Sequence, residues 1–251
     1  MFERFKSRSY EPENIDTGSY TADEYEGCLV ELRRVNRWMG DSRSLGHTLF
    51  RTVQAEALSS FSVLDVGAGS GELLRVTANW ARQTNRGFRG VGLELNQRSV
   101  EAIRDESLSY RELKAVRGDA LNLPFLAQEF DYAICSLFTH HFHEDQIVRI
   151  LEEMSRVARR KIFVIDLHRH PMAYFLYTTV GKLILHTRLI REDGALSILK
   201  GFNKQELKTL GDRAKLEGSV VDRHFPFRLV LSGSGNHSPL KRDTVVVDRA
   251  A

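Results

Sequence analysis

The sequence predicts an α/β fold built on a parallel sheet with helices packed against it. Between residues 62 and 167, short apolar runs typical of buried strands alternate with segments whose apolar residues recur at helical spacing. Such alternation favours a right-handedly wound parallel sheet. With 251 residues, 42% of them hydrophobic and 27% charged, the chain is long enough for one such domain and small additions.

The composition argues against several classes of protein. The net charge of +3 is small and the basic residues are interleaved with acidic ones, which gives little support to nucleic acid as a partner. Cys28 and Cys135 form neither a disulfide framework nor a C-x-x-C pair. Residues 1–6 lack the apolar core of a signal peptide, and no stretch reaches the length of a membrane span. We therefore expect a cytoplasmic protein; the sequence predicts no oligomeric state.

The N-terminal region divides into a polar segment and a predicted helix. Residues 1–20 are polar and rich in turn formers, so we expect a loosely held arm. Thr21 and Glu24 form a capping-box pattern that predicts a helix ending near Gly40. Arginines on one side of this helix could reach a ligand carboxylate or form a solvated face. We assign residues 1–43 to an arm and helix outside the main domain.

A predicted helix over residues 44–58 leads into a strand, a glycine-rich turn and a further helix. The strand covers residues 62–66, and Gly67, Gly69 and Gly71 follow it at alternate positions. Glycines allow the sharp turn and let a ligand approach the main chain closely. The open N-terminus of the next helix offers N–H groups and partial positive charge to an anionic group. This turn is the first candidate ligand site.

The spacing of the glycines and the acid before them indicate which ligand fits. A dinucleotide fingerprint reads G-x-G-x-x-G, whereas here the pattern is G-x-G-x-G, and Asp65 stands two places before the first glycine. A carboxylate at this position suits a ligand that carries an ammonium group and would repel a pyrophosphate. A nicotinamide oxidoreductase is therefore disfavoured.

Two further acidic residues lie at or after the ends of the next two strands. Glu94 lies at the tip of the strand over residues 90–95, where a carboxylate can accept both ribose hydroxyls of a nucleoside; the alternative is a charge at a helix N-terminus. Asp119 follows the strand over residues 113–116, where it can accept an adenine amino group while the Ala120 N–H meets a ring nitrogen. The alternative for Asp119 is an Asx turn.

Histidines follow the fourth predicted strand, over residues 130–138. His140 and His141 stand at its carboxyl end, where ligands of open parallel sheets bind. An imidazole there can take the proton of a phenol or enol, and we prefer His141 for this role. The alternative is that either ring packs against or caps the following helix. A fifth strand is predicted over residues 161–167.

Residues 168–200 interrupt the alternation of strand and helix. Their segment 172–186 is apolar and aromatic, which suits either a helical lid over a hydrophobic acceptor or a surface helix that completes the core. Nearby side chains also raise the possibility of a metal site. The candidate ligands are Asp166, His168 and His170 together with His140 and His141. Because they show no firm ligand spacing, we predict no metal.

A capping box at Asn203 and Glu206 predicts a further helix, and two closing strands are expected between residues 220 and 231. The glycine- and serine-rich sequence beyond them predicts a flexible tail over residues 233–251. The main domain is thus expected to cover residues 44–232.

Two of these segments resemble motifs of a known family. Residues 65–71 match completely the first motif of class I S-adenosylmethionine-dependent methyltransferases, [D/E]-x-G-x-G-x-G. Residues 118–125, Gly-Asp-Ala-Leu-Asn-Leu-Pro-Phe, look like the corresponding loop of methyltransferases of ubiquinone and menaquinone biosynthesis. The resemblance implies a Rossmann-like, seven-stranded, mostly parallel sheet with helices on both faces and an antiparallel final hairpin. It also implies S-adenosylmethionine as the cofactor.

The resemblance further implies roles for individual residues. Asp65 and the backbone of Gly67, Ala68, Gly69 and Gly71 would hold the methionine end of the cofactor. The ribose would lie at Glu94 and Leu95, and the adenine at Asp119 and Ala120. Backbone groups of Ser136 or Leu137 would meet the ammonium end.

We expect a methyltransferase that acts on oxygen or carbon of a small acceptor: an aromatic, phenolic, quinone or polyketide-like molecule that can carry a lipid tail. The sequence lacks Asp/Asn-Pro-Pro-Tyr, and Cys135 lacks a preceding Pro, which disfavours methylation of nucleic-acid bases. The alternatives are methylation of RNA or protein, and a cofactor-binding domain without catalysis.

Overall fold

A computed structural model describes residues 2–18, 40–181 and 185–235, together with five residues of the intervening N-terminal segment, which are Tyr20, Thr21, Glu24, Gly27 and Glu31. The predicted capping box is present, since the Thr21 N–H donates to Glu24 Oε2 at 3.0 Å and the Glu24 N–H donates to Thr21 Oγ1 at 3.2 Å. The arginines predicted for this helix, Cys28, and most of the predicted tail lie outside the described residues.

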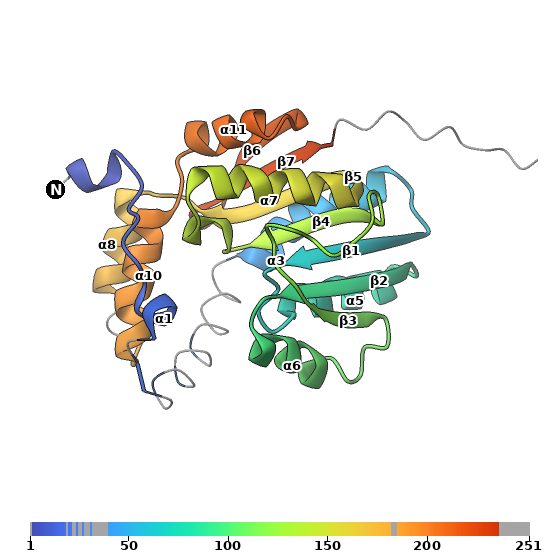
Figure 1. The fold of residues 1–251 in the computed structure, drawn as a ribbon, viewed down its shortest axis with the longest axis horizontal. Coiled ribbons are helices and arrows are strands. Elements are labelled where there is room, and N and C mark those ends of the chain that lie inside the picture. Colours follow the sequence, from blue (N-terminus) through green and yellow to red (C-terminus); the bar gives the residue numbers. More distant parts are fainter. Residues whose placement is uncertain are drawn as a thin grey trace, which may run out of the picture.

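A seven-stranded sheet forms the centre of the molecule, with the order β3-β2-β1-β4-β5-β7-β6 (Figure 1). The pairs among the first five strands are parallel, whereas β7 runs antiparallel between β5 and β6. The strands are β1 (Ser60–Val66), β2 (Gly87–Glu94), β3 (Leu113–Arg117), β4 (Phe130–Ser136), β5 (Ala158–Leu167), β6 (Glu217–His224) and β7 (Arg228–Ser234). The predicted Rossmann-like fold class is confirmed.

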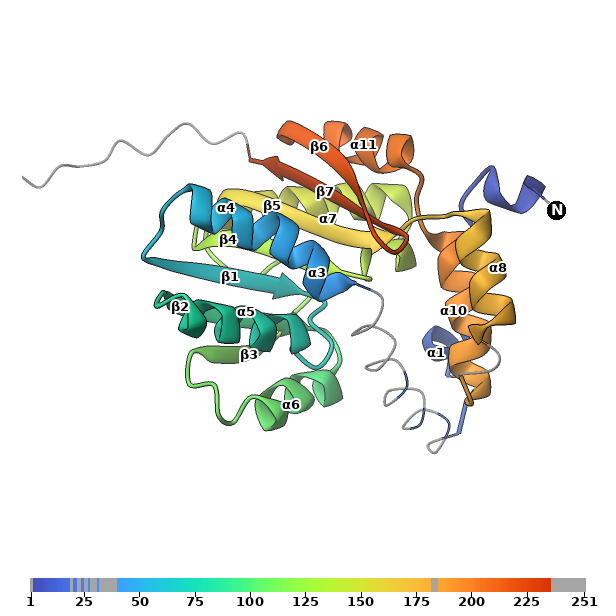
Figure 2. The ribbon, with the colours of Figure 1, turned by 180° about the vertical axis from the view of Figure 1, so that it is seen from behind.

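Helices pack on both faces of this sheet. The helices of the main domain are α3 (Asp41–Leu45), the π-helix η2 (Gly46–Phe50), α4 (Arg51–Ala55), α5 (Glu72–Gln83), α6 (Gln97–Glu106), the 3-10 turn η3 (Thr139–His141), α7 (Glu144–Val157) and α11 (Lys204–Arg213). The stretch α3–η2–α4 and α5 cover the face seen in Figure 2, and α7 and α11 cover the other. The strands are apolar on both sides for this reason: Leu64 packs in one core cluster and its neighbour Val63 in the other.

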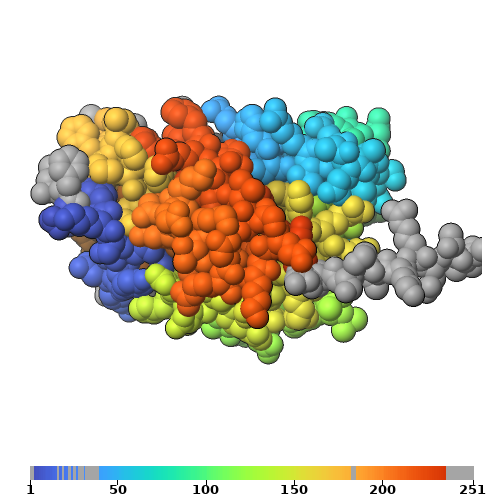
Figure 3. Space-filling view, turned by 90° about the horizontal axis from the view of Figure 1, so that it is seen from above, coloured from blue at the N-terminus to red at the C-terminus, as the bar shows by residue number. Residues whose placement is uncertain are grey.

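A cap lies beside the carboxyl end of β1 (Figure 1). Its described elements are η1 (Phe2–Phe5), α1 (Asn14–Thr17), α8 (Pro171–Thr179) and α10 (Arg188–Lys200). The space-filling view shows the N-terminal residues, in blue, against the yellow and orange residues that follow β5 (Figure 3). The segment after β5 was expected to form either a lid or a helix that completes the core. Helix α8 buries only Ala173 and exposes Met172, Phe175 and Leu176, so it adds little to the core.

The expectation of a loosely held N-terminal arm is wrong. Arg8 and Glu13 are buried, with exposed fractions of 7% and 3%. The Arg8 guanidinium donates to the Lys200 carbonyl at 2.9 Å and the His140 carbonyl at 3.1 Å. Asp193 of α10 accepts from the N–H groups that open α1. The arm is held by charged groups that find partners far along the chain, which its local composition does not reveal.

None of the described helices is long and apolar enough to cross a membrane.

Candidate functional site

The glycine turn joins β1 to α5 at the position where the strand order reverses, between β1 and β4. Ligands of open α/β sheets bind outside the carboxyl ends of the strands at such a position. Gly67, Gly69 and Gly71 all have positive φ angles, of 69°, 57° and 80°. Gly67 also lies against the ring of Phe138, which follows β4, so the loops after β1 and β4 are in contact. No atom lies within 4 Å of a Cβ placed on Gly69, so the main chain there can be approached.

We expect Gly67→Ala to destabilise the protein by about 2–4 kcal/mol, because a Cβ atom would require a disfavoured backbone conformation and would lie 2.6 Å from Phe138 Cγ. Denaturant unfolding measures the change. Combining it with Phe138→Leu should recover part of the loss. Strictly additive effects of the two substitutions would contradict this explanation.

Two carboxylates lie in the same corner of this turn. Asp65 is buried, and burial together with the negative charge of Glu94 raises its pKa well above the ordinary value. Glu94 accepts a hydrogen bond from the Gly69 N–H at 2.5 Å. Burial raises the pKa of Glu94 as well, although hydrogen bonds from the Gly69 and Leu95 N–H groups oppose the rise. Two partly desolvated acids side by side favour a ligand that brings positive charge and hydroxyl donors.

The loop after β3 carries Asp119 and Ala120. Asp119 is exposed, and its Oδ1 atom accepts from the Leu121 N–H at 2.9 Å, while its carbonyl accepts from the Asn122 N–H at 3.1 Å. This is the Asx turn that the sequence left open as an alternative. Ala120 is buried. The assignment of both residues to an adenine base stays a prediction.

Ser136 is the last residue of β4, and Leu137 follows it. Leu137 has a φ of 50°, unusual for a residue with a side chain, and its N–H donates to the Ile165 carbonyl of β5 at 2.9 Å. A ligand ammonium group donates hydrogen bonds, so it would need carbonyl oxygens of this segment rather than its N–H groups. The role of Ser136 and Leu137 in holding the ammonium end also stays a prediction.

His140 forms a buried pair with Asp166 at the carboxyl ends of β4 and β5. The Nδ1 atom of His140 lies 2.7 Å from Asp166 Oδ1. The other carboxylate oxygen accepts from the Thr139 hydroxyl at 2.6 Å and from the His140 N–H at 3.2 Å. Sequence reasoning considered Asp166 only as a metal ligand and missed this pairing. The available signal was the strand order, because β4 and β5 are neighbours and Ser136 pairs with Ile165.

The electrostatics of this pair fix the state of the imidazole. Burial would raise the pKa of Asp166, but interactions with His140 and hydrogen bonds from Thr139 and the Leu167 N–H hold it well below the ordinary value. An ionised carboxylate only accepts, so the His140 Nδ1 atom carries the hydrogen and its Nε2 atom presents a lone pair. Burial lowers the pKa of His140, against the opposing effect of Asp166, so the ring is neutral at neutral pH.

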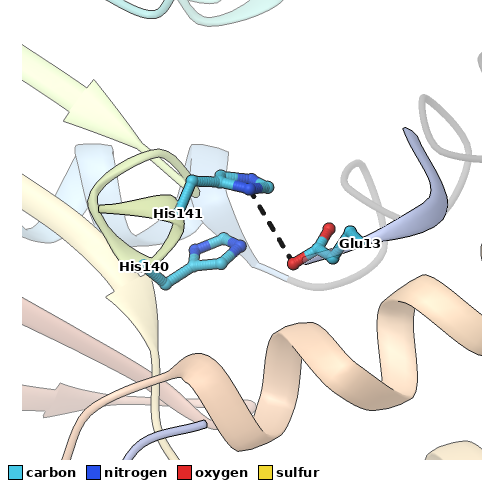
Figure 4. A group of neighbouring side chains, drawn as sticks. All are labelled: Glu13, His140 and His141. Carbon is cyan, nitrogen blue, oxygen red and sulfur yellow. Dashed lines mark ion pairs between the residues drawn. The ribbon is translucent and has the colours of Figure 1, made fainter. Parts of the chain in front are cut away.

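His141 lies beside this pair, with its ring centroid 4.2 Å from that of His140. Its Nδ1 atom is 3.8 Å from Glu13 Oε1, and both rings face the Glu13 carboxylate (Figure 4). Glu13 comes from the N-terminal arm and was not predicted. The buried Lys200 ammonium lies 3.1 Å from the same Glu13 oxygen, although out of line for a hydrogen bond.

The donor atoms of Glu13, His140 and His141 lie within 4.8 Å of one another, which is close enough to hold a metal ion. Lys200 already places a positive charge against this carboxylate, which disfavours a second cation at the same place. Of the other histidines considered as ligands, His170 accepts from the Met172 N–H at 3.2 Å, and its ring lies 5.2 Å from that of His168.

Residues 63–161 match a family model described as a methyltransferase domain. A curated relative is the phthiotriol/phenolphthiotriol dimycocerosates methyltransferase of Mycobacterium tuberculosis, 26% identical over 193 residues. The match covers 73% of this chain and 63% of that protein, so the chain spans under two thirds of the relative's length. The ubiquinone and menaquinone subgroup suggested by residues 118–125 stays a prediction.

Solved structures share the fold. Human N-acetylserotonin methyltransferase in complex with SAM has a TM-score of 0.60, at 16% identity, over 92% of this chain and 63% of its own. Magnesium protoporphyrin IX methyltransferase from Synechocystis with bound SAH has a TM-score of 0.52, at 15% identity, over 78% and 83%. The CMeT domain of the citrinin polyketide synthase has a TM-score of 0.55, at 9% identity, over 71% and 47%. The family match over residues 63–161 and the shared seven-stranded fold support a class I S-adenosylmethionine-dependent methyltransferase.

Proposed function

We propose that this protein transfers the methyl group of S-adenosylmethionine to a hydroxyl oxygen of a small hydrophobic acceptor, such as a phenol or an enol. The observation that carries the proposal is the His140–Asp166 pair, a buried neutral imidazole with an oriented lone pair. It stands one loop away from the glycine turn, to which Phe138 connects it. A base at this place is useful only if the acceptor must lose a proton.

The residues of the turn fit the cofactor. Asp65 and Glu94 supply the negative charge that a sulfonium nucleoside needs, and the backbone at Gly69 is open to approach. When bound, the cofactor supplies an electrophilic methyl group. Glu94 would then exchange the Gly69 N–H for the ribose hydroxyls, and the acceptor side of the site would be left to the residues after β4.

His140 would act on the acceptor hydroxyl. The Nε2 atom of His140 would take the proton of the acceptor hydroxyl as its oxygen accepts the methyl group that the bound cofactor would supply. Asp166 holds the Nδ1–H and stabilises the imidazolium that forms. Alignment of the oxygen, the methyl carbon and the sulfur supplies much of the remaining rate. This geometry favours His140 as the base, whereas the sequence analysis preferred His141.

A hydrophobic acceptor is supported by the apolar character of the cap. Helix α8 carries exposed Met172, Phe175 and Leu176 at its surface. The relatives and neighbours named above include a methyltransferase of phthiotriol dimycocerosates and a polyketide synthase domain. We propose that residues 44–232 form the methyltransferase domain and that residues 168–200 form its lid over the acceptor.

The test is transfer of radiolabelled methyl from S-adenosylmethionine by the full chain. We expect label in the solvent-extractable fraction of a cell extract and in simple long-chain phenols. Reagents that cleave methyl ethers should release this label from the product. Label attached to a carbon atom of the acceptor would show C-methylation and would contradict O-methylation. Label confined to RNA or protein, or binding without transfer to any fraction, would contradict the proposal.

A further inference from the structure

The Glu13 carboxylate is buried at the reacting end of the site, although it comes from the N-terminal arm. It directly precedes α1, and only 3% of the residue is exposed. Its Oε1 atom lies 3.8 Å from His141 Nδ1, and a carboxylate oxygen of Glu13 lies within 4.8 Å of a ring nitrogen of His140. His140 therefore has a carboxylate on two sides: Asp166 at Nδ1, and Glu13 in the direction that its ring faces in Figure 4.

Three side chains hold Glu13 in place. Lys200, the last residue of α10, supplies the ammonium at 3.1 Å. Asp193, two turns earlier on α10, accepts from the N–H groups of Asn14 and Ile15, at 2.9 and 3.0 Å, and so fixes the start of α1. Arg8 donates to the carbonyls of Lys200 and His140, which ties the arm to both.

Burying this pair of charges has a cost. Desolvation of a carboxylate and an ammonium commonly offsets their mutual attraction, so a buried ion pair is weak support for stability as such. The position of the pair against the proposed base suggests a second effect. A proton taken up by His140 creates a positive charge, and a carboxylate within a few ångströms stabilises that charge in a poorly solvated site.

The charged groups around His140 act in opposing directions. Asp166 of β5 and Glu13 of the arm favour the protonated ring, whereas burial and the neighbouring His141 oppose it. Lys200 of α10 lies 3.1 Å from a Glu13 oxygen and weakens the effect of Glu13, which still raises the pKa of His140. Arg8 directs its guanidinium to backbone carbonyls.

We propose that Glu13 is a positioning residue of the reaction, delivered by the N-terminal arm, and that it stabilises His140 after the ring has taken the proton of the acceptor. This inference rests on the proposed function of His140 as the base. By this inference the arm is part of the acceptor end of the site. The Lys200 ammonium is then the group that keeps the carboxylate there.

The first test needs no acceptor. Proton NMR follows the titration of the histidine rings in the full chain, and His140→Gln identifies the His140 signal by its loss. In Glu13→Gln, we expect His140 to titrate at lower pH than in the wild type. Glu11→Gln is the matched control, because Glu11 lies on the same arm and is exposed. An identical His140 titration in both variants and the wild type would overturn the proposal.

The second test is the pH dependence of kcat. We expect Glu13→Gln to lower kcat by about tenfold, well below the 10²–10⁴-fold that a general base supplies, and to move the acidic limb of the profile to lower pH. Glu13→Asp keeps the charge, so it should keep the limb in place with a smaller loss of kcat. Equal losses in both variants with an unmoved limb would show a merely structural role and overturn the inference.

A chelator control separates a metal site from this proposal. We expect kcat and the His140 titration to be unchanged after dialysis against EDTA and after addition of Zn²⁺ or Mn²⁺. Activity that is lost on dialysis and restored by one of these ions would make Glu13 a metal ligand, contrary to the proposal. If the wild type transfers no methyl group while Glu13→Gln still shifts the His140 titration, the proposed function fails and the electrostatic role of Glu13 stands.

Discussion

His140→Gln is expected to lower kcat by about 10²–10⁴-fold while leaving the affinity for S-adenosylmethionine unchanged. The reason is that the Nε2 lone pair would be lost, whereas the cofactor turn lies on other strands. Glutamine retains a polar side chain of comparable reach, so the packing around Asp166 is disturbed little. Initial rates give kcat, and calorimetric titration with the cofactor gives the affinity.

Two companion variants locate the effect. His141→Gln removes a ring in contact with His140 but leaves the hydrogen bond to Asp166, so we expect a much smaller loss. Asp166→Asn no longer holds the hydrogen on Nδ1, so kcat should fall nearly as far as in His140→Gln. Since Asp166 also accepts from Thr139, unfolding of this variant must be measured alongside. A His140→Gln protein with more than half of the wild-type kcat would remove His140 from the mechanism.

The pH dependence follows from the direction of the shift. Burial lowers the pKa of His140, so the ring stays neutral at mildly acidic pH, where an unperturbed histidine would already be half protonated. Activity should therefore persist below about pH 6.5 and fall only at more acidic pH. A kcat that is halved at or above pH 6.5 would contradict the neutral, buried ring.

Asp65→Asn is expected to weaken S-adenosylmethionine binding by about 30- to 1,000-fold, equivalent to about 2–4 kcal/mol. The carboxylate is buried beside Glu94, and both would face a positively charged ligand. Without the charge of Asp65, only Glu94 remains to compensate the positive charge of the ligand. Calorimetric titration measures the change.

The same substitution should stabilise the ligand-free protein. The pKa of Asp65 is raised in the folded state, so the folded protein binds this proton more tightly than the unfolded chain. Stability is then lost as pH rises from the unfolded pKa through the folded one, and the full penalty is present above the folded pKa. Neutral asparagine removes that penalty. We expect a higher Tm without cofactor and a smaller cofactor-induced rise in Tm; a lower Tm without cofactor would contradict the account.

Much of the geometry of the proposed cofactor end was predictable from sequence because its signals are local. Asp65 and the three glycines lie within seven consecutive residues at the end of β1, and the positive φ angles of the turn fall on glycines. Glu94 is the last residue of the next strand, and the parallel pairing of β1 with β2 brings it to the Gly69 N–H. Local chemistry and sheet topology together give this half of the site.

The acceptor end could not be predicted in the same way because its contacts are long-range. Asp166 reaches His140 across 26 residues, and Arg8 reaches its carbonyl across 132. Glu13 and Lys200 are charged residues in segments that read as a polar arm and a surface helix. Charged side chains are usually exposed, so no local pattern distinguishes these buried ones. Only the docking of the arm on α10 brings them together.

The most direct measurement is a crystal structure of the full chain with S-adenosylhomocysteine. The account predicts the nucleoside in the turn after β1, with Glu94 on the ribose hydroxyls instead of the Gly69 N–H, and with the sulfur facing His140 across the space left for the acceptor. A nucleoside bound elsewhere, or a sulfur directed away from His140, would contradict it.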